Sequence, residues 1–272
     1  MKRNQIERIK AYETCEKLKQ NGFSNKEIIN QVIKEYSIPA GTIYDWLKYN
    51  KSPFGKRKIK YNDSLFYVLG SLLGDGCAYY WKKRDKYMVH LVGEKEFIEK
   101  YSDKLANCTG KKIKGYIDRN KNIWNHKTWN IELYQLLKKA REKKEIIINL
   151  LNKGDYYNNS IQIIEGFFDA EGCVKIINEK IRKTPKICLD ITNVDFELLE
   201  IIKRLLMDSL KIEARYSIQK AGISKNGTKH QKAYHLRIYK KEHIRKFFEN
   251  IKTIKLKSEK IEYLNNWLNN GK

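Results

Sequence analysis

Two short segments of this chain repeat one pattern, and the repeat limits what the chain can fold into. The first is "LGSLLGDGC" (69–77) and the second is "EGFFDAEGC" (165–173). Each places two small residues four positions apart among apolar ones, and then has an acid, a glycine and a cysteine. The acids are Asp75 and Glu171, and Glu171 follows Asp75 by 96 positions. A repeat on this scale indicates a fold built from two similar halves.

The small residues predict that two helices pack closely. Gly70 and Gly74 share one helix face, and Gly166 and Ala170 share another, so two backbones can approach each other there. The acids then end both helices at the same end of the contact. Carboxylates at helix C-termini oppose the helix dipole, and two of them repel each other. A divalent cation removes both penalties, because carboxylates and backbone carbonyls are hard oxygen ligands. One Asp-Gly pair alone is a common helix stop, but two copies in register favour a metal site.

The segments after each motif follow one order in both halves. Periodicity predicts helix, strand, strand, helix, strand, strand, helix, which is an α+β fold with antiparallel hairpins. In the first half the predicted strands are 77–83, 86–92, 111–118 and 128–134, and the later helices are 94–106 and 135–144. In the second half the strands are 173–179, 186–192, 211–219 and 232–239, and the helices are 195–210, 241–250 and a closing helix at 258–270.

Residues 1–50 predict a separate helical unit. Three short amphipathic segments with a tight turn before the last are typical of a helix-turn-helix module. A three-helix bundle that binds nothing is the alternative. The side chains expected to face a DNA major groove are Thr42, Tyr44 and Lys48. The predicted division of the chain is 1–50, a basic linker at 51–61, a first half at 62–158 and a second half at 159–272.

The formal net charge of +24 indicates a polyanionic partner. Its basic residues are spread along the whole chain, so nucleic acid is the leading candidate, and a merely lysine-rich composition is the alternative. No apolar run approaches the ~18–20 residues that span a bilayer, so no membrane partner is expected. The five cysteines have no C-x-x-C spacing, which favours reduced, buried thiols in an intracellular protein over a disulfide framework or a zinc site.

The segments "VLGSLLGDG" (68–76) and "IEGFFDAEG" (164–172) resemble the two motifs of the LAGLIDADG homing endonucleases, and the resemblance extends over 62–260. It implies a monomer whose two αββαββα halves form an antiparallel saddle in the DNA major groove. It also implies that Asp75 and Glu171 bind the metal, helped by the carbonyls of Gly74 and Ala170. The implied activity is site-specific cleavage of both strands of double-stranded DNA with Mg²⁺, for which Mn²⁺ can substitute, leaving short 3′ overhangs. The implied location is intracellular, in a prokaryote or an organelle.

The resemblance also implies supporting residues. Asn193, at the end of the second strand of its half, takes the place of an amide that orders water in the active site. Gly93 stands at the matching place of the first half and has no side chain. Lys257 corresponds to a catalytic lysine. Asp169 fits a structural acid better than a third metal ligand, because the first motif has Leu73 in its place.

The strand and loop segments carry long polar side chains that can read base edges. The predicted DNA contacts there are Lys82, Lys83, Arg84, Arg119, Asn122, His126, Lys127, Arg215, Tyr216, Gln219, Lys225, His230 and Gln231. Two other functions stay open at this point: a DNA-binding regulator that does not cut, and an RNA maturase whose partner is structured intron RNA. The retention of both acids favours the nuclease.

Overall fold

The structure is a computed structural model of the chain, and it describes residues 5–53, 59–81, 86–177, 186–223 and 227–269. The chain forms two compact units, Met1–Lys58 and Ile59–Lys272. The boundary between the two units falls inside the predicted linker at 51–61, so the linker residues from Ile59 onward belong to the second unit. The amide of Ile59 donates to Glu132 at 2.9 Å, and that of Lys60 donates to the carbonyl of Cys108 at 2.8 Å. None of the helices in the described ranges has the length and apolar character that crossing a bilayer demands.

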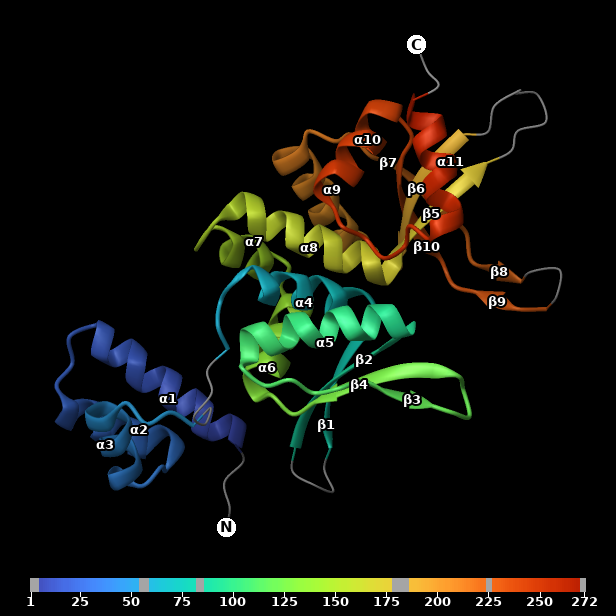
Figure 1. Ribbon diagram of the computed structural model, residues 1–272. Helices are drawn as coiled ribbons and strands as arrows, with labels where there is room; N and C mark the ends of the chain where they lie inside the picture. The colour runs from blue at the N-terminus through green and yellow to red at the C-terminus, as the bar shows by residue number, and fades with distance from the viewer. Residues whose placement is uncertain (1–4, 54–58, 82–85, 178–185, 224–226, 270–272) are drawn as a thin grey trace. The chain divides into compact units, whose positions relative to one another are not determined.

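The first unit consists of three helices, α1 (Gln5–Gln20), α2 (Asn25–Tyr36) and α3 (Ala40–Tyr49) (Figure 1). Ser24 caps α2, because its side chain accepts from the amide of Glu27 while the side chain of Glu27 accepts from the amide of Ser24. In the core, the ring of Trp46 lies edge-on to that of Tyr12, with centroids 5.6 Å apart. The predicted helices are confirmed, and a DNA-binding role for them stays a prediction.

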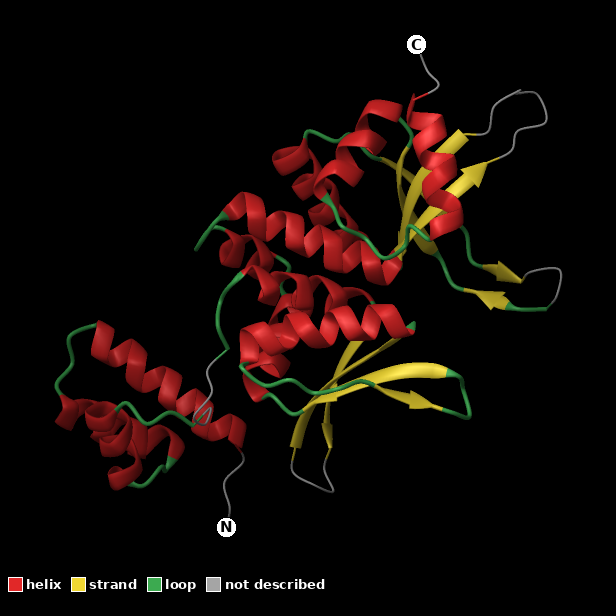
Figure 2. Ribbon diagram, viewed as in Figure 1, coloured by secondary structure: helices red, strands yellow, loops and turns green. Residues whose placement is uncertain are grey.

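The second unit contains two halves with the same order of elements (Figures 1 and 2). The first half is α4 (Asp63–Gly74), β1 (Gly76–Trp81), β2 (Lys86–Gly93), α5 (Lys95–Thr109), β3 (Tyr116–Asp118), β4 (Ile123–Thr128) and α6 (Ile131–Glu142). After α7 (Glu145–Leu151), the second half is α8 (Tyr156–Glu171), β5 (Gly172–Ile177), β6 (Lys186–Asn193), α9 (Phe196–Leu210), β7 (Arg215–Gln219), β10 (Ala233–Ile238) and α10 (Lys241–Asn250). The predicted αββαββα order is confirmed. The second half adds the hairpin β8 (Gly222–Ile223) and β9 (Lys229–His230), and α11 (Ser258–Asn269) follows α10.

Each half has a four-stranded antiparallel sheet, with strand orders β1-β2-β4-β3 and β5-β6-β10-β7. Successive side chains alternate between the two faces of a sheet. Leu189 and Ile191 of β6 are buried on the face that packs against α8 and α10, and Asp190 between them lies on the other face. Figure 2 shows the helices of the first half on one side of its sheet only. Among the described residues, both sheets therefore have one face toward helices and one open face.

The strand predicted at 128–134 is wrong in its position. The strand in the structure is β4, which ends at Thr128, and residues from Ile131 onward are helical. The side chain of Asn130 accepts from the amide of Leu133 and so starts α6 at a point where the apolar pattern alone reads as a strand.

The two halves meet where α4 packs against α8, and glycines permit the contact (Figure 1). A Cβ on Gly70 would lie 2.3 Å from the carbonyl oxygen of Ile163, and one on Gly166 would lie 2.1 Å from that of Tyr67. Both distances are far shorter than van der Waals contact, so only glycine fits at these positions. The predicted close packing of the two motif helices is confirmed.

Candidate metal centre and nucleic-acid interface

Asp75 and Glu171 lie together because the seam brings both helix ends to one place. α4 ends at Gly74 with Asp75 as its C-cap residue, and Glu171 is the last residue of α8. A Cβ on Gly74 would lie 2.6 Å from the Cβ of Ala170 and 2.9 Å from the Cγ of Glu171. The end of one helix therefore touches the end of the other, and both acids are at the same end of the seam.

The surroundings of the two acids favour their protonated forms. Burial raises the pKa of Glu171 to about 7, and the neighbouring charge of Asp75 adds to the rise. A hydrogen bond of 2.8 Å from Asn193 Nδ2 to Glu171 Oε1 acts in the opposite direction. Burial also raises the pKa of Asp75, and the charge of Lys255 opposes it. The pair is thus held in a place that suits a cation better than it suits two free carboxylates.

A cavity of about 380 Å³ opens beside the acids. Its walls come from both halves, and the polar and charged side chains among them are Asp75, Glu94, Lys255, Lys257 and Lys260. Two carboxylates are hard oxygen ligands for a divalent cation such as Mg²⁺, which usually keeps several of its waters. Within the described residues no group of three or more His, Cys, Asp and Glu side chains gathers around one point, so the two acids are the whole side-chain donor set identified there.

Lys255 is a site residue that the sequence does not single out. Its charge lowers the pKa of both Asp75 and Glu171, which places it close to the pair. The predicted lysine, Lys257, also lines the cavity, but its ammonium group pairs with Glu94 at 3.2 Å, and both of these side chains are mostly exposed. The segment "IKLK" (254–257) contains both lysines, and this alternation was the signal for a second candidate.

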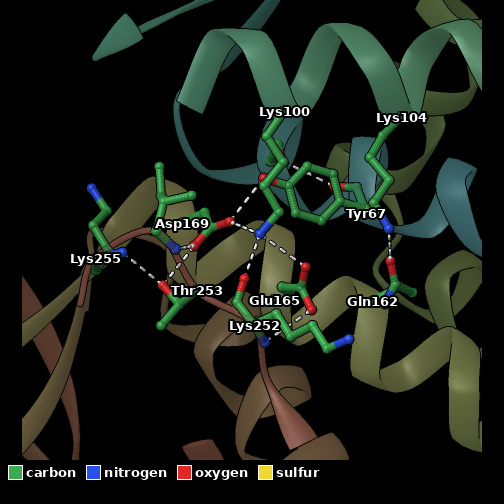
Figure 3. Close-up of polar contacts among 11 residues, drawn as sticks. Tyr67, Lys100, Lys104, Gln162, Glu165, Asp169, Lys252, Thr253 and Lys255 are labelled. Carbon is green, nitrogen blue, oxygen red and sulfur yellow. Dashed lines mark hydrogen bonds and ion pairs between the residues drawn. The ribbon is translucent and has the colours of Figure 1, made fainter. Parts of the chain in front are cut away.

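A buried polar cluster fixes the segment that carries Lys255 (Figure 3). Asp169 is fully buried and accepts hydrogen bonds from the Thr253 hydroxyl at 2.6 Å and the Ile254 amide at 3.0 Å. The Tyr67 hydroxyl donates to it at 2.8 Å, and Lys100 donates at 2.7 Å. Asp169 therefore bonds to protein groups and holds the chain just before Lys255, as its interpretation as a structural acid requires.

Glu165 completes this cluster. It pairs with Lys100 at 2.9 Å through one oxygen and accepts from the Lys252 amide at 3.2 Å through the other (Figure 3). Leu73 occupies the place of Asp169 in the first motif and is buried. The cluster is thus present in the second motif without an equivalent acid in the first, so the two halves support the centre unequally.

The predicted DNA contacts fall into several groups. Those that lie exposed or partly exposed on α3, on sheet strands or in hairpins are Thr42, Tyr44, Lys48, Arg119, Asn122, Lys127, Arg215, Gln219, His230 and Gln231. Lys82, Lys83, Arg84 and Lys225 lie outside the described residues. For both groups of residues, contact with DNA stays a prediction.

Two predicted contacts are wrong. His126 is buried on the helix-facing side of β4, where its ring lies edge-on to Tyr101 at 5.1 Å and its Nε2 bonds to the carbonyl of Ile113. Tyr216 packs its ring against Phe196 of α9. In both cases strand alternation puts the side chain on the face opposite to the open one.

The cysteine prediction holds in part. All five thiols are free, and Cys15, Cys108 and Cys188 are buried as expected. Cys77 and Cys173 are exposed, because each sits at the start of a strand on its open face.

The fold consists of two repeated α+β halves, and a pair of acids lies at the end of the glycine-lined seam between their motif helices. Residues 159–252 match the family model of the LAGLIDADG-like domain. The matched residues contain the second motif, and the match confirms there the family resemblance drawn from the motifs.

The chain is also similar to solved structures. One, from work on the structures and dynamics of mesophilic variants of the homing endonuclease I-DmoI, is 24% identical, with a TM-score of 0.48 over 70% of this chain and 90% of that one. I-DmoI in complex with DNA and Ca is 19% identical, with a TM-score of 0.47 over 75% and 97% of the two chains. Full-length DUF199/WhiA from Thermatoga maritima is 14% identical, with a TM-score of 0.46 over 77% and 61%. No curated protein sequence matches the chain.

Proposed function

We propose that this protein is a site-specific endonuclease that hydrolyses both strands of double-stranded DNA with a divalent metal ion. The observation that carries the proposal is the pair of acids, Asp75 and Glu171, held at the end of the α4–α8 seam. A protein that only bound DNA would gain nothing from two repelling carboxylates at helix C-termini, and this chain already carries a net charge of +24 for a polyanion.

The donor set fits a hard divalent cation. The carboxylates of Asp75 and Glu171 would hold it, with the carbonyls of Gly74 and Ala170 beside them, and Mg²⁺ suits such ligands with Mn²⁺ as a substitute. When bound, the cation supplies an activated water and stabilises the leaving oxygen of a phosphodiester. The raised pKa of Glu171 means that positive charge nearby is needed to keep it in its ligating form at neutral pH.

Residues of this chain prepare the centre for that ion. Asn193 holds one oxygen of Glu171 through its 2.8 Å hydrogen bond, which orients the carboxylate. Lys255 lowers the pKa of both acids and provides positive charge near a scissile phosphate. The adjoining cavity of about 380 Å³ has room for a phosphodiester group. Lys257 lines the same cavity. Its ammonium group pairs with Glu94, and it can contact the DNA backbone once that ion pair opens.

The open faces of the two sheets are the proposed DNA interface. A saddle made of two such faces fits one continuous duplex, so a single chain acts as a monomer on double-stranded DNA inside the cell. Short 3′ overhangs are the expected product, as the resemblance of the two motifs to the LAGLIDADG homing endonucleases implies.

A cleavage selection tests this function. The full chain is incubated with a library of random double-stranded DNA in Mg²⁺, and the new ends are sequenced. The expected result is one preferred sequence with both strands cut and 3′ overhangs. Failure to cut any sequence in Mg²⁺, Mn²⁺ or another divalent ion would remove the proposal.

A further inference from the structure

A buried carboxylate lies in the middle of the open face of the second sheet. Asp190 of β6 stands between Leu189 and Ile191, whose side chains face the helices, so its own side chain lies on the opposite face. In the sheet register it is paired with Cys173 of β5 and with Arg237 of β10. Its side chain is nevertheless 0% exposed. A negative charge is unexpected on a surface that faces a polyanion, and it calls for an explanation.

Three basic side chains from the two flanking strands cover Asp190. Lys175 of β5 donates a hydrogen bond to it. Arg237 donates from Nε at 3.3 Å, and His235 Nδ1 lies 3.1 Å away. Burial would raise the pKa of Asp190, yet the hydrogen bond from Lys175 and the neighbouring charges bring it below its ordinary value. The carboxylate is therefore ionised and fully engaged with protein groups, so it does not approach DNA itself.

The guanidinium of Arg237 is held from one side and open on another. Its Nε bonds to Asp190 at 3.3 Å. Its side chain is 29% exposed and lines a cavity of about 230 Å³ together with Arg215 and Lys240. An arginine fixed through Nε keeps a terminal N–H edge for a ligand. That edge matches the O6 and N7 acceptors of guanine in the major groove. Fixing the side chain before binding reduces the entropy lost on contact and favours one base over others.

The first half has different chemistry at the equivalent positions. Val89 and Leu189 pair with Thr128 and Ile238 in the two sheets. One residue along the strands from these pairs, His90 occupies the position in the first sheet that Asp190 occupies in the second. Lys127 likewise occupies the position of Arg237. His90 bonds to Asn125 at 2.8 Å, and Lys127 lies over the ring of Tyr116 at 5.5 Å. The first half thus has a lysine on an aromatic ring where the second has an arginine fixed by a buried acid.

We propose that Asp190 positions Arg237 to read a guanine in the half of the DNA target that the second sheet contacts. The described part of the first sheet has no such arginine, so the symmetry-related base pair in the other half of the target is not read in this way. This inference rests on the proposed function. Asp190 precedes Asn193, the partner of Glu171, by three residues on β6. With a rise of about 3.4 Å per residue this is about 10 Å, or roughly three base pairs outward from the cleavage centre.

The test measures base preference one position at a time. The probes are duplexes of the preferred sequence in which each base pair is replaced in turn, and binding is measured in Ca²⁺ for the full-length wild type, Arg237→Lys and Asp190→Asn. Arg245→Lys is the matched control, because Arg245 lies on α10 and bonds to the carbonyl of Leu268. Circular dichroism shows whether each variant is folded. If Asp190→Asn is unstable, Arg237→Lys still tests the inference, because it keeps the positive charge and removes the guanidinium group.

The wild type is expected to lose roughly tenfold to a hundredfold in affinity when the one guanine is replaced. Arg237→Lys and Asp190→Asn should reduce this discrimination to about threefold or less at that same position and leave the other positions unchanged. The control Arg245→Lys should discriminate at every position as the wild type does. A preferred sequence without a guanine there overturns the inference, and so does a loss of discrimination spread equally over all positions. If the wild type binds and cuts no sequence at all, the proposed function fails first, and the inference falls with it.

Discussion

Asn193 donates a hydrogen bond of 2.8 Å to Glu171, the acid that ends α8. The first half has Gly93 at the matching strand end, so Asp75 receives no such support from that position. A group that orients a metal ligand typically changes metal affinity or activity by about 10–100-fold when it is removed. The two acids are therefore not equivalent, although the motifs that carry them are.

The first prediction concerns this asymmetry. Asn193→Ala should lower the rate of cleavage by about 10–100-fold, because Glu171 loses the hydrogen bond that orients it and favours its ionised form. One strand should be affected more than the other, so nicked plasmid should accumulate before linear plasmid. Gel analysis of a supercoiled plasmid that carries the preferred sequence measures both products. Equal slowing of the two strands would show that Asn193 serves both cuts.

The second prediction separates two lysines. Lys255→Met should reduce cleavage by about a hundredfold, because its charge lowers the pKa of both Asp75 and Glu171. Lys257→Met should change it by about threefold or less, because that side chain is mostly exposed and pairs with Glu94. Single-turnover rates in Mg²⁺ measure the difference. The reverse order of effects would assign the role to Lys257, as the sequence resemblance does.

The third prediction is a pH dependence of stability in the metal-free protein. Folding raises the pKa of Glu171 from its ordinary 4.5 to about 7, so between these values the folded state binds more protons than the unfolded state. The contribution of Glu171 to the free energy of unfolding therefore falls as the pH rises through this window. Glu171→Gln removes this loss. After allowance for partial exposure of the site, the variant should be more stable than the wild type by about 2 kcal/mol at pH 8 and nearly equal to it below pH 4.5.

Denaturant unfolding in EDTA at the two pH values measures this difference. Addition of Mg²⁺ at pH 8 should stabilise the wild type and leave Glu171→Gln almost unchanged, since a ligand stabilises only the state that binds it. A wild type that is as stable as the variant at pH 8 without metal would contradict the strained placement of the acid pair.

The fourth prediction concerns the seam. Gly166→Ala would put a Cβ 2.1 Å from the carbonyl oxygen of Tyr67, and this carbonyl belongs to a helix backbone that moves only with α4. The variant should lose about 3 kcal/mol of stability or more, at the upper end of overpacking effects. Gly222→Ala is the control, because a Cβ there meets nothing within 4 Å. Thermal unfolding of both variants measures the effect, and a Gly166→Ala protein as stable as the control would show that the helices do not pack as described.

Features that depend on local or periodic patterns could be predicted from the sequence. The two motif helices and their glycines are of this kind. The position of β4 could not, because the N-cap Asn130 turns an apolar, strand-like stretch into the start of α6. The same error left His126 outside the predicted strand, whereas it lies inside β4, where alternation turns its side chain toward the helices.

Other parts of the site depend on contacts between distant segments. Lys255 and Lys257 alternate in one short segment, and only the anchoring of residues 253 and 254 by Asp169 shows which lysine is held near the acids. Asp190 reads in the sequence as an ordinary strand acid, and its role appears when β5 and β10 bring basic side chains to it. Such sites follow from the three-dimensional register and not from spacing along the chain.

The most direct test of the central claim is cleavage of the preferred sequence by the two acid variants. Wild type, Asp75→Asn and Glu171→Gln are incubated with that DNA in Mg²⁺, and their binding to it is measured in parallel. If Asp75 and Glu171 together hold the metal, both variants should bind the DNA with an affinity close to or above that of the wild type, while double-strand cleavage falls by at least about a thousandfold. Substantial cleavage by either variant, or by the double variant, would contradict the account.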